Sequence, residues 1–155
     1  MAEVIEIRPH DTFKYPKNML SIFLAGTIDM GNSRNWQEEF VNEVKSWKDE
    51  KVTYVIYNPR RVEDFGEDQE EFDYQVKWEL NQLEASDLIV MHILGTSKSP
   101  ITLLELGLFA RSGKLEVICE PEFYRYNNVR ITCDRYSVPI YKSMDEFLKT
   151  FESNK

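Results

Sequence analysis

The chain has 155 residues, of which 42% are hydrophobic and 13% aromatic, so it is long enough to bury the core of one globular domain. Its formal net charge of −8 argues against duplex DNA, RNA or an anionic membrane as the main partner, because these surfaces attract clustered lysine and arginine. Small molecules remain as the expected ligands. We find no membrane-spanning apolar run, no signal-peptide pattern and no metal-ligand spacing around Cys119 and Cys133, which together predict a reduced, cytoplasmic setting.

The first element that we predict is a strand over residues 20–25. This run, LSIFLA, is continuously apolar and ends at Gly26, which is the pattern of a strand buried on both faces of a parallel sheet. Residues 1–18 mix charges, prolines and scattered apolar side chains. We interpret them as an extended or partly ordered N-terminal arm, and residues 19–155 as the domain.

The loop GTIDMGNS after this strand offers candidate substrate-binding groups. Gly26 permits a close backbone approach that a Cβ would prevent, and Thr27 and Asp29 supply polar side chains. The spacing matches neither a dinucleotide fingerprint nor a P-loop. A helix should follow over residues 36–48, with Asn35 as its N-cap.

The second predicted strand, residues 52–57, leads into the polar sequence Asn58-Pro59-Arg60-Arg61. Open α/β sheets place ligand groups in the loops that follow the carboxyl ends of their strands. We therefore predict that Asn58 and Arg60 bind substrate, with a solvated loop as the alternative.

Two acids fall on helix faces that the apolar pattern predicts to be buried. Glu79 lies on a helical stripe with Phe72, Val76, Leu80 and Leu83. After a third strand over residues 87–94, Ser99 and Pro100 open a helix in which Glu105 should share a face with core residues, namely Ile101, Leu104, Leu108 and Phe109. Ionised carboxylates are rarely buried without a partner, so we interpret both as functional; surface acids on helix flanks are the alternative.

The remaining elements complete an α/β fold. We predict a fourth strand over residues 115–119, an irregular segment over 120–136, a fifth strand over 138–141 and a last helix over 144–151. Alternating strands and helices indicate a doubly wound, flavodoxin or Rossmann-like parallel sheet of five strands with helices on both faces. In the order 2-1-3-4-5 the first and third strands are neighbours, so the loop at Gly26 and the segment before Glu105 should converge at their carboxyl ends.

The residue set favours chemistry by carboxyl groups. We find no cluster of histidine, cysteine and aspartate at ligand spacing, no candidate Ser-His-Asp set and no cofactor fingerprint, so we expect no metal and no cofactor. Glycosyl transfer is the leading case. One carboxylate attacks the anomeric carbon and a second group handles the proton of the leaving group.

The motifs FLAGTIDMG, NWQ, YNPRR, WELNQLEASDLIV, SPITLLELG and NNV together resemble the nucleoside 2-deoxyribosyltransferase-like family, from about Ser21 to Val138. The resemblance implies that Glu105 is the nucleophile that forms a 2-deoxyribosyl ester. It places Glu79 where the family has an Asp that mediates proton transfer at the base, and Asn128 where a residue reaches the sugar's 5′ end in a neighbouring subunit. It also implies a homo-oligomer, either a dimer or a hexamer of dimers, acting on deoxynucleosides and free bases.

The resemblance leaves the substrate open. Ser99 stands where related 2′-deoxynucleoside 5′-phosphate N-hydrolases carry a phosphate-binding Ser, but Asp29 stands where they carry a phosphate-binding Arg. A carboxylate at that position would repel a 5′ phosphate. Deoxyribosyl transfer is our first interpretation and 5′-monophosphate hydrolysis our second. A TIR-like NAD glycohydrolase and a non-catalytic nucleotide-sensing module are more distant alternatives.

Overall fold

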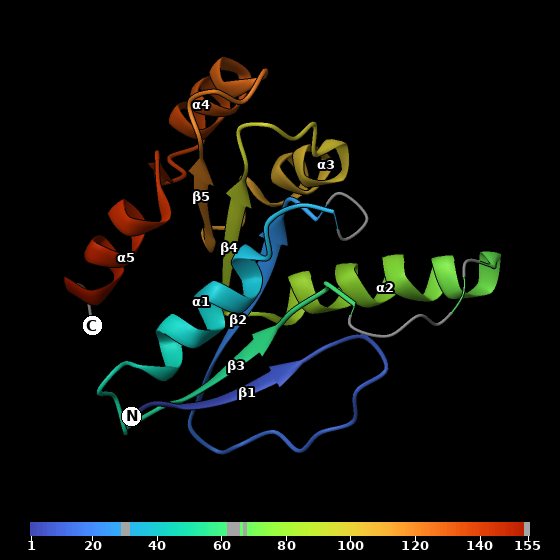
Figure 1. The fold of residues 1–155 in the computed structure, drawn as a ribbon, viewed down its shortest axis with the longest axis vertical. Coiled ribbons are helices and arrows are strands. Elements are labelled where there is room, and N and C mark those ends of the chain that lie inside the picture. The colour runs from blue at the N-terminus through green and yellow to red at the C-terminus, as the bar shows by residue number, and fades with distance from the viewer. Residues whose placement is uncertain (29–31, 62–65, 67, 154–155) are drawn as a thin grey trace. The chain divides into compact units, whose positions relative to one another are not determined.

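The structure is a computed structural model that describes residues 1–28, 32–61, 66 and 68–153 (Figure 1). Strands and helices alternate along most of this part of the chain, as the sequence predicts. The elements are β1 (Glu3–Ile7), β2 (Met19–Gly26), α1 (Trp36–Lys45), β3 (Thr53–Tyr57), α2 (Gln69–Ala85), β4 (Leu88–Ile93), α3 (Pro100–Phe109), β5 (Leu115–Cys119), α4 (Tyr126–Arg135), β6 (Ile140–Tyr141) and α5 (Met144–Ser153).

The sheet has the strand order β1-β3-β2-β4-β5-β6. When β1 is left aside, the other five strands follow the order 2-1-3-4-5 in their own sequence numbering. The prediction of a doubly wound α/β fold with a parallel sheet is therefore confirmed. The parallel register aligns Met19 with Thr53 in β2 and β3, and Val117 with Ile140 in β5 and β6.

The sixth strand, β1, was not predicted. It pairs in parallel with β3, with Glu3 opposite Thr53 and Ile7 opposite Tyr57 (Figure 1). The predicted number of five strands is therefore wrong by this one strand, which lies within the segment that we interpreted as an extended or partly ordered arm. The strand has only five residues, EVIEI, and two of them are acids, so its local sequence pattern is weak. It forms because the edge of β3 offers backbone groups for hydrogen bonding.

The chain divides into two compact units. The N-terminal unit comprises Met1–Leu24 and Arg34–Ile89, and the C-terminal unit comprises Ala25–Ser33 and Val90–Lys155. Both units contain strands and helices. Within the described part of the chain, none of the helices combines the length and apolar character needed to cross a membrane.

In the N-terminal unit, β2 and β3 supply the centre of the core. Their fully buried side chains include Ile22, Phe23, Leu24, Val55 and Ile56. Helix α1 adds a buried apolar stripe at helical spacing. Full burial of each large apolar side chain contributes about 1.5–3 kcal/mol to the free energy of folding. The stripe consists of Trp36, Phe40, Val41 and Val44.

Helix α1 begins as predicted, because Asn35 Oδ1 accepts a hydrogen bond from Glu38 N and Asn35 Nδ2 donates to Glu38 Oε2. It ends at Lys45, three residues before the predicted end at Lys48. Ser46 closes it, since both the backbone N–H and the hydroxyl of Ser46 donate to Glu43 O.

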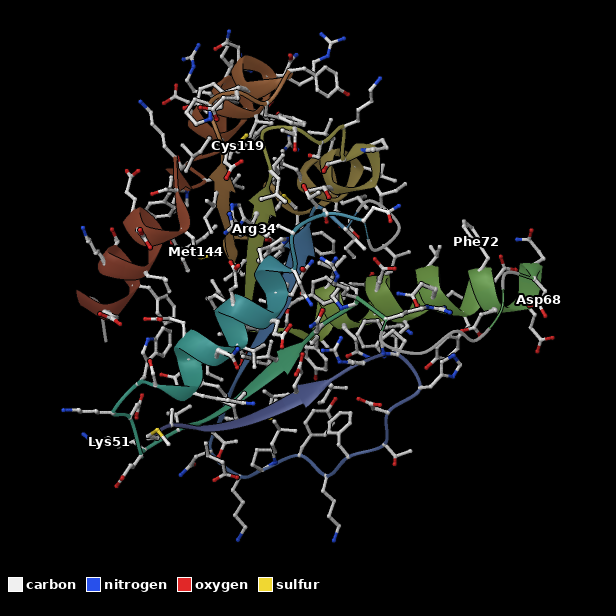
Figure 2. The ribbon with its side chains drawn as sticks, viewed as in Figure 1. Arg34, Lys51, Asp68, Phe72, Cys119 and Met144 are labelled. Carbon is white, nitrogen blue, oxygen red and sulfur yellow. The ribbon has the colours of Figure 1, made fainter. Side chains whose placement is uncertain are left out.

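The inner face of α2 differs from the predicted one. Phe72 is 62% exposed and Val76 is 41% exposed, and Figure 2 shows Phe72 projecting away from the helix. Trp78 is buried instead, with its ring centroid 6.2 Å from that of Phe23 and 6.4 Å from that of Tyr57. Leu83 of the predicted stripe is fully buried as well, so the prediction holds at this position.

In the C-terminal unit, β4 and β5 carry a continuous apolar core, including Val90, Met91, Val117 and Ile118. The prediction of an irregular segment over residues 120–136 is wrong, because this segment contains helix α4. Val129 and Cys133 of α4 are buried at the i, i+4 spacing of one helix face. Two consecutive asparagines in its first turn weaken the local helix signal, and tertiary burial outweighs this weakness.

Candidate active site

Gly26 is the last residue of β2, and it has a backbone conformation that residues with a side chain rarely adopt. Its φ is +128°, and a Cβ at this position would lie 2.0 Å from His92 O. The close approach allows Thr27 N to donate to His92 O over 3.0 Å. The predicted need for a glycine is thereby explained by contact with a neighbouring strand.

Three buried hydroxyl groups lie together in the C-terminal unit. Thr27 Oγ1 lies 2.7 Å from Ser99 Oγ and 3.1 Å from Ser97 Oγ, and the two serine hydroxyls are 2.8 Å apart. Leu94 ties the group to the end of β4, because its N–H donates to Thr27 Oγ1 and its carbonyl accepts from Ser97 Oγ. We call Thr27, Ser97 and Ser99 the hydroxyl cluster; sequence reasoning found Thr27 and Ser99 but missed Ser97.

Ser99 directly precedes α3, as predicted, but its hydroxyl does not cap the helix. The residue is left-handed, with φ 46° and ψ 52°, and its hydroxyl lies in the hydroxyl cluster instead. Such a conformation costs about 1–2 kcal/mol for a residue with a Cβ, so the surrounding contacts must hold it in place. Strained, over-determined residues of this kind cluster at functional sites.

Glu105 is buried in α3, with 6% of its surface exposed. The predicted inward orientation is confirmed, but the predicted companions on its face are wrong. Thr102 and Leu106 are buried on α3, whereas three of the expected core residues are 57–61% exposed, namely Ile101, Leu104 and Leu108. Because nearly every position of α3 is apolar, periodicity alone could not identify its inner face.

In the N-terminal unit, Asn58 is fully buried and holds a loop together. Its N–H donates to Ile7 O over 2.8 Å, and its Nδ2 donates to Glu6 Oε2 over 2.8 Å. Its Oδ1 accepts from Arg60 N at 3.0 Å. Sequence reasoning missed Glu6, because its contact with Asn58 depends on the pairing of β1 with β3.

The Arg60 side chain is also buried. It donates to Gln37 Oε1 over 3.2 Å and to Arg34 O over 3.1 Å. Burial, together with the nearby charge of Arg8, lowers the pKa of Arg60 from its usual value. Arg8 in turn donates to Arg60 O, so the N-terminal segment shapes the loop that we predicted to bind substrate. Substrate contact by Asn58 and Arg60 stays a prediction.

Glu79 faces inward on α2, as predicted, and is half-buried. Its Oε2 accepts a hydrogen bond from Gln75 Nε2 at 3.0 Å. Desolvation raises the pKa of Glu79, while the Gln75 hydrogen bond and the charge of Arg61 oppose the rise. The net upward direction suits a carboxyl group that donates a proton near neutral pH.

Two predicted residues remain, Asp29 and Asn128. Asp29 lies outside the described residues. Asn128 is exposed on α4, where it lines a groove of about 340 Å³ between α3 and α4. The groove is also lined by Leu103, Leu106, Gly107, Tyr124, Arg125, Val129 and Thr132. Among the described residues, no group of three or more His, Cys, Asp or Glu side chains is arranged to hold a metal ion.

Residues 19–123 match the sequence model of the family described as nucleoside 2-deoxyribosyltransferase like. The chain belongs to this family. The comparison with curated proteins found no match. The family match includes Glu79, Glu105 and the hydroxyl cluster, and it ends before Asn128, so the family-level assignment covers both candidate acids.

Sequence reasoning missed the side chains that surround Glu79. Gln75 carries a usable signal, since it precedes Glu79 by four residues and such residues are neighbours on a helix. Arg61 donates to Gln75 Oε1 at 2.7 Å and pairs with Glu71 at 2.8 Å. Neither contact of Arg61 could be inferred from spacing, because the residue comes from the loop after β3.

Proposed function

We propose that the protein cleaves the N-glycosidic bond of 2′-deoxyribonucleosides through a covalent deoxyribosyl-Glu105 intermediate and transfers the sugar to another nucleobase or to water. The observation that carries this proposal is the burial of Glu105 on α3, in a chain of the nucleoside 2-deoxyribosyltransferase-like family. A carboxylate held away from water is a competent nucleophile at an anomeric carbon.

In the first step, a Glu105 carboxylate oxygen bonds to C1′ while the bond between C1′ and the base nitrogen breaks. The electron pair of that bond goes to the departing base, and Glu79 supplies the proton that neutralises it. In the second step, the nitrogen of an incoming base attacks C1′, the ester bond to Glu105 breaks, and the proton of the incoming base goes to Glu79. Water in place of the base gives hydrolysis.

Selectivity for 2′-deoxyribose follows from the same chemistry. The reaction passes through an oxocarbenium-like transition state, and a 2′ hydroxyl would withdraw electrons from it. The second oxygen of the attacking carboxylate also needs the space near C2′ that a ribose hydroxyl would fill. We therefore expect deoxyribonucleosides to be preferred over ribonucleosides.

A second candidate is hydrolysis of 2′-deoxynucleoside 5′-monophosphates, which the hydroxyl cluster favours. Three buried hydroxyls lie at the start of α3, and the first-turn N–H groups of a helix attract phosphate. In the first candidate the same hydroxyls would bind the free 5′ hydroxyl. The remaining proposed substrate contacts are Gly26, Asn58 and Arg60.

We also propose that the protein acts as a homo-oligomer, either a dimer or a hexamer of dimers, in the cytoplasm. Exposed apolar side chains on α3, on α4 and just before α4 support self-association, because contact with another subunit would remove this apolar surface from water. These side chains are Ile101, Leu104, Leu108, Tyr124 and Ile131. Asn128, which is exposed on α4, would complete a neighbouring subunit's site.

Product analysis separates the two candidates. The protein is incubated with deoxynucleosides and their 5′-monophosphates, with and without a second base, and the products are separated by chromatography. New deoxynucleosides formed only when a second base is present support transfer, whereas free base released from monophosphates alone supports hydrolysis. Activity on NAD, with none on deoxynucleosides or their 5′-monophosphates, contradicts both.

A further inference from the structure

A run of polar contacts connects the N-terminal segment to Glu79 within the N-terminal unit. His10 Nε2 lies 2.7 Å from Glu71 Oε1, and Arg61 Nη2 lies 2.8 Å from the same oxygen. Arg61 Nε donates to Gln75 Oε1 over 2.7 Å, and Gln75 Nε2 donates to Glu79 Oε2 over 3.0 Å. The run ends on the carboxyl group that the proposed function uses as the proton donor.

The orientation of the Gln75 amide follows from the chemistry of its neighbours. The guanidinium of Arg61 only donates hydrogen bonds, so the Gln75 atom that faces Arg61 Nε must be the oxygen. The backbone carbonyl of Pro59 only accepts, and it lies 3.3 Å from the other end of the amide, which must be the nitrogen. Both neighbours therefore point an N–H of Gln75 toward Glu79.

This orientation distinguishes the two oxygens of Glu79. Oε2 accepts the Gln75 N–H, and a proton on the same oxygen would compete with that hydrogen bond. The acid proton therefore belongs on Oε1, which leaves it available for transfer. We propose that Gln75 is a positioning residue that directs the acid proton of Glu79 to Oε1, with its own amide oriented by Arg61; the inference rests on the proposed role of Glu79 as proton donor.

The N-terminal segment anchors the outer end of the run. His10 has a left-handed φ of 72°, its ring stacks on Tyr74 at 4.0 Å, and its N–H donates to the Tyr74 hydroxyl over 3.0 Å. Glu71 therefore has two partners, one on this segment and one on the loop after β3. Among the described residues, the charged and titratable groups of this run are His10, Glu71 and Arg61, and Arg61 acts on Glu79 directly through its charge.

The helix offers a matched control for Gln75. Gln69 Nε2 donates to Asp73 Oδ1 over 2.7 Å, with the same four-residue spacing on the same helix, but this pair is exposed. The test compares Gln75→Met, which keeps the length of the side chain and removes its amide, with Gln69→Met. Gln75→Asn keeps an amide but shortens its reach, and it serves as a second variant if the methionine perturbs folding.

Two measurements are made on each full-length variant. Turnover is measured on a natural deoxynucleoside and on one whose leaving group needs no protonation, and the Glu79 carboxyl is titrated by carbon NMR. We expect both Gln75 variants to lose about 10-fold on the natural substrate, as for loss of a hydrogen bond to a charged group, and to change little on the activated one. Loss of the N–H donor should move the Glu79 titration to higher pH, and Gln69→Met should match the wild type.

Glu79→Gln keeps the two proposals distinguishable. If Glu79→Gln spares the activated substrate while the Gln75 variants match the wild type in turnover and titration, the inference about Gln75 is wrong and the proposed function stands. If Glu79→Gln loses the same factor on both substrates, the proton-donor role itself is wrong. An equal loss on both substrates in the Gln75 variants, with an unmoved titration, would mark Gln75 as purely structural and overturn the inference.

Discussion

Helices α2 and α3 hold their acids in opposite ways. In α2, Glu79 has the polar neighbours Gln75 and Arg61, on a helix that buries Trp78 and Leu83 and exposes Phe72. In α3, Glu105 is buried on a helix whose other positions are largely apolar, and two of its leucines are exposed. The different surroundings fit the proposed roles, in which Glu79 is the proton donor and Glu105 the nucleophile.

The largest effect should come from removing the carboxylate of α3. Glu105→Gln keeps the shape and removes the nucleophile, so turnover should fall by several orders of magnitude while the circular dichroism spectrum stays unchanged. Mass spectrometry of wild-type protein quenched during turnover should show a deoxyribosyl adduct on the peptide that contains Glu105. Glu122→Gln, an exposed acid in the same unit, serves as the control, and wild-type turnover in Glu105→Gln would refute the nucleophile assignment.

The carboxyl group of α2 should matter less, and in a way that depends on the substrate. Glu79→Gln should lower turnover on a natural deoxynucleoside by about 10²–10⁴-fold, the range typical of general acid catalysis. A substrate whose leaving group needs no proton should be spared most of this loss. Steady-state kinetics on the two substrates compares the loss of turnover that Glu79→Gln causes on each.

The exposed apolar face of α3 predicts a change in assembly. Leu104→Asp and Leu108→Asp place a charge among side chains that are 60% and 57% exposed, so they should shift an oligomer to monomers without unfolding the chain. Phe72→Asp, on the equally exposed apolar position of α2, should leave assembly unchanged. Light scattering measures the oligomeric state of each variant. A fully active wild-type monomer would remove the support for Asn128 as a shared site residue.

The smallest expected effect is on the pH dependence of stability. The pKa of Glu79 is raised from its ordinary value of 4.5 in the folded protein, so above that value the unfolded chain binds fewer protons than the folded one. Stability from this group is present below the ordinary value and is lost as the pH rises through the raised pKa. Glu79→Gln cannot ionise and should therefore gain stability relative to the wild type over that window.

Urea unfolding at a series of pH values measures the difference in the free energy of unfolding between Glu79→Gln and the wild type. Glu70→Gln, an exposed acid in the first turn of α2, provides the control and should give a nearly constant difference. A constant difference for Glu79→Gln as well would show that burial does not raise the pKa of this carboxyl.

The sequence by itself determined the alternation of strands and helices, the order of the five main strands and the inward orientation of Glu79 and Glu105. These features are encoded locally, because apolar runs, helical periodicity and capping residues such as Asn35 are visible in short windows. Two elements that local patterns do not record were decided only by the tertiary structure. Residues 3–7 needed the edge of β3, and α4 needed the burial of Val129 and Cys133.

The environment of each candidate site residue was likewise decided in three dimensions. The strained Ser99 is held by Thr27, which is 72 residues away along the chain, and the Gln75 amide is oriented by Arg61 from another loop. Hydrogen bonds of this kind depend on where side chains point after the sheet has formed, and no periodic pattern records them. The sequence identified the acids, whereas the fold determined which groups hold them.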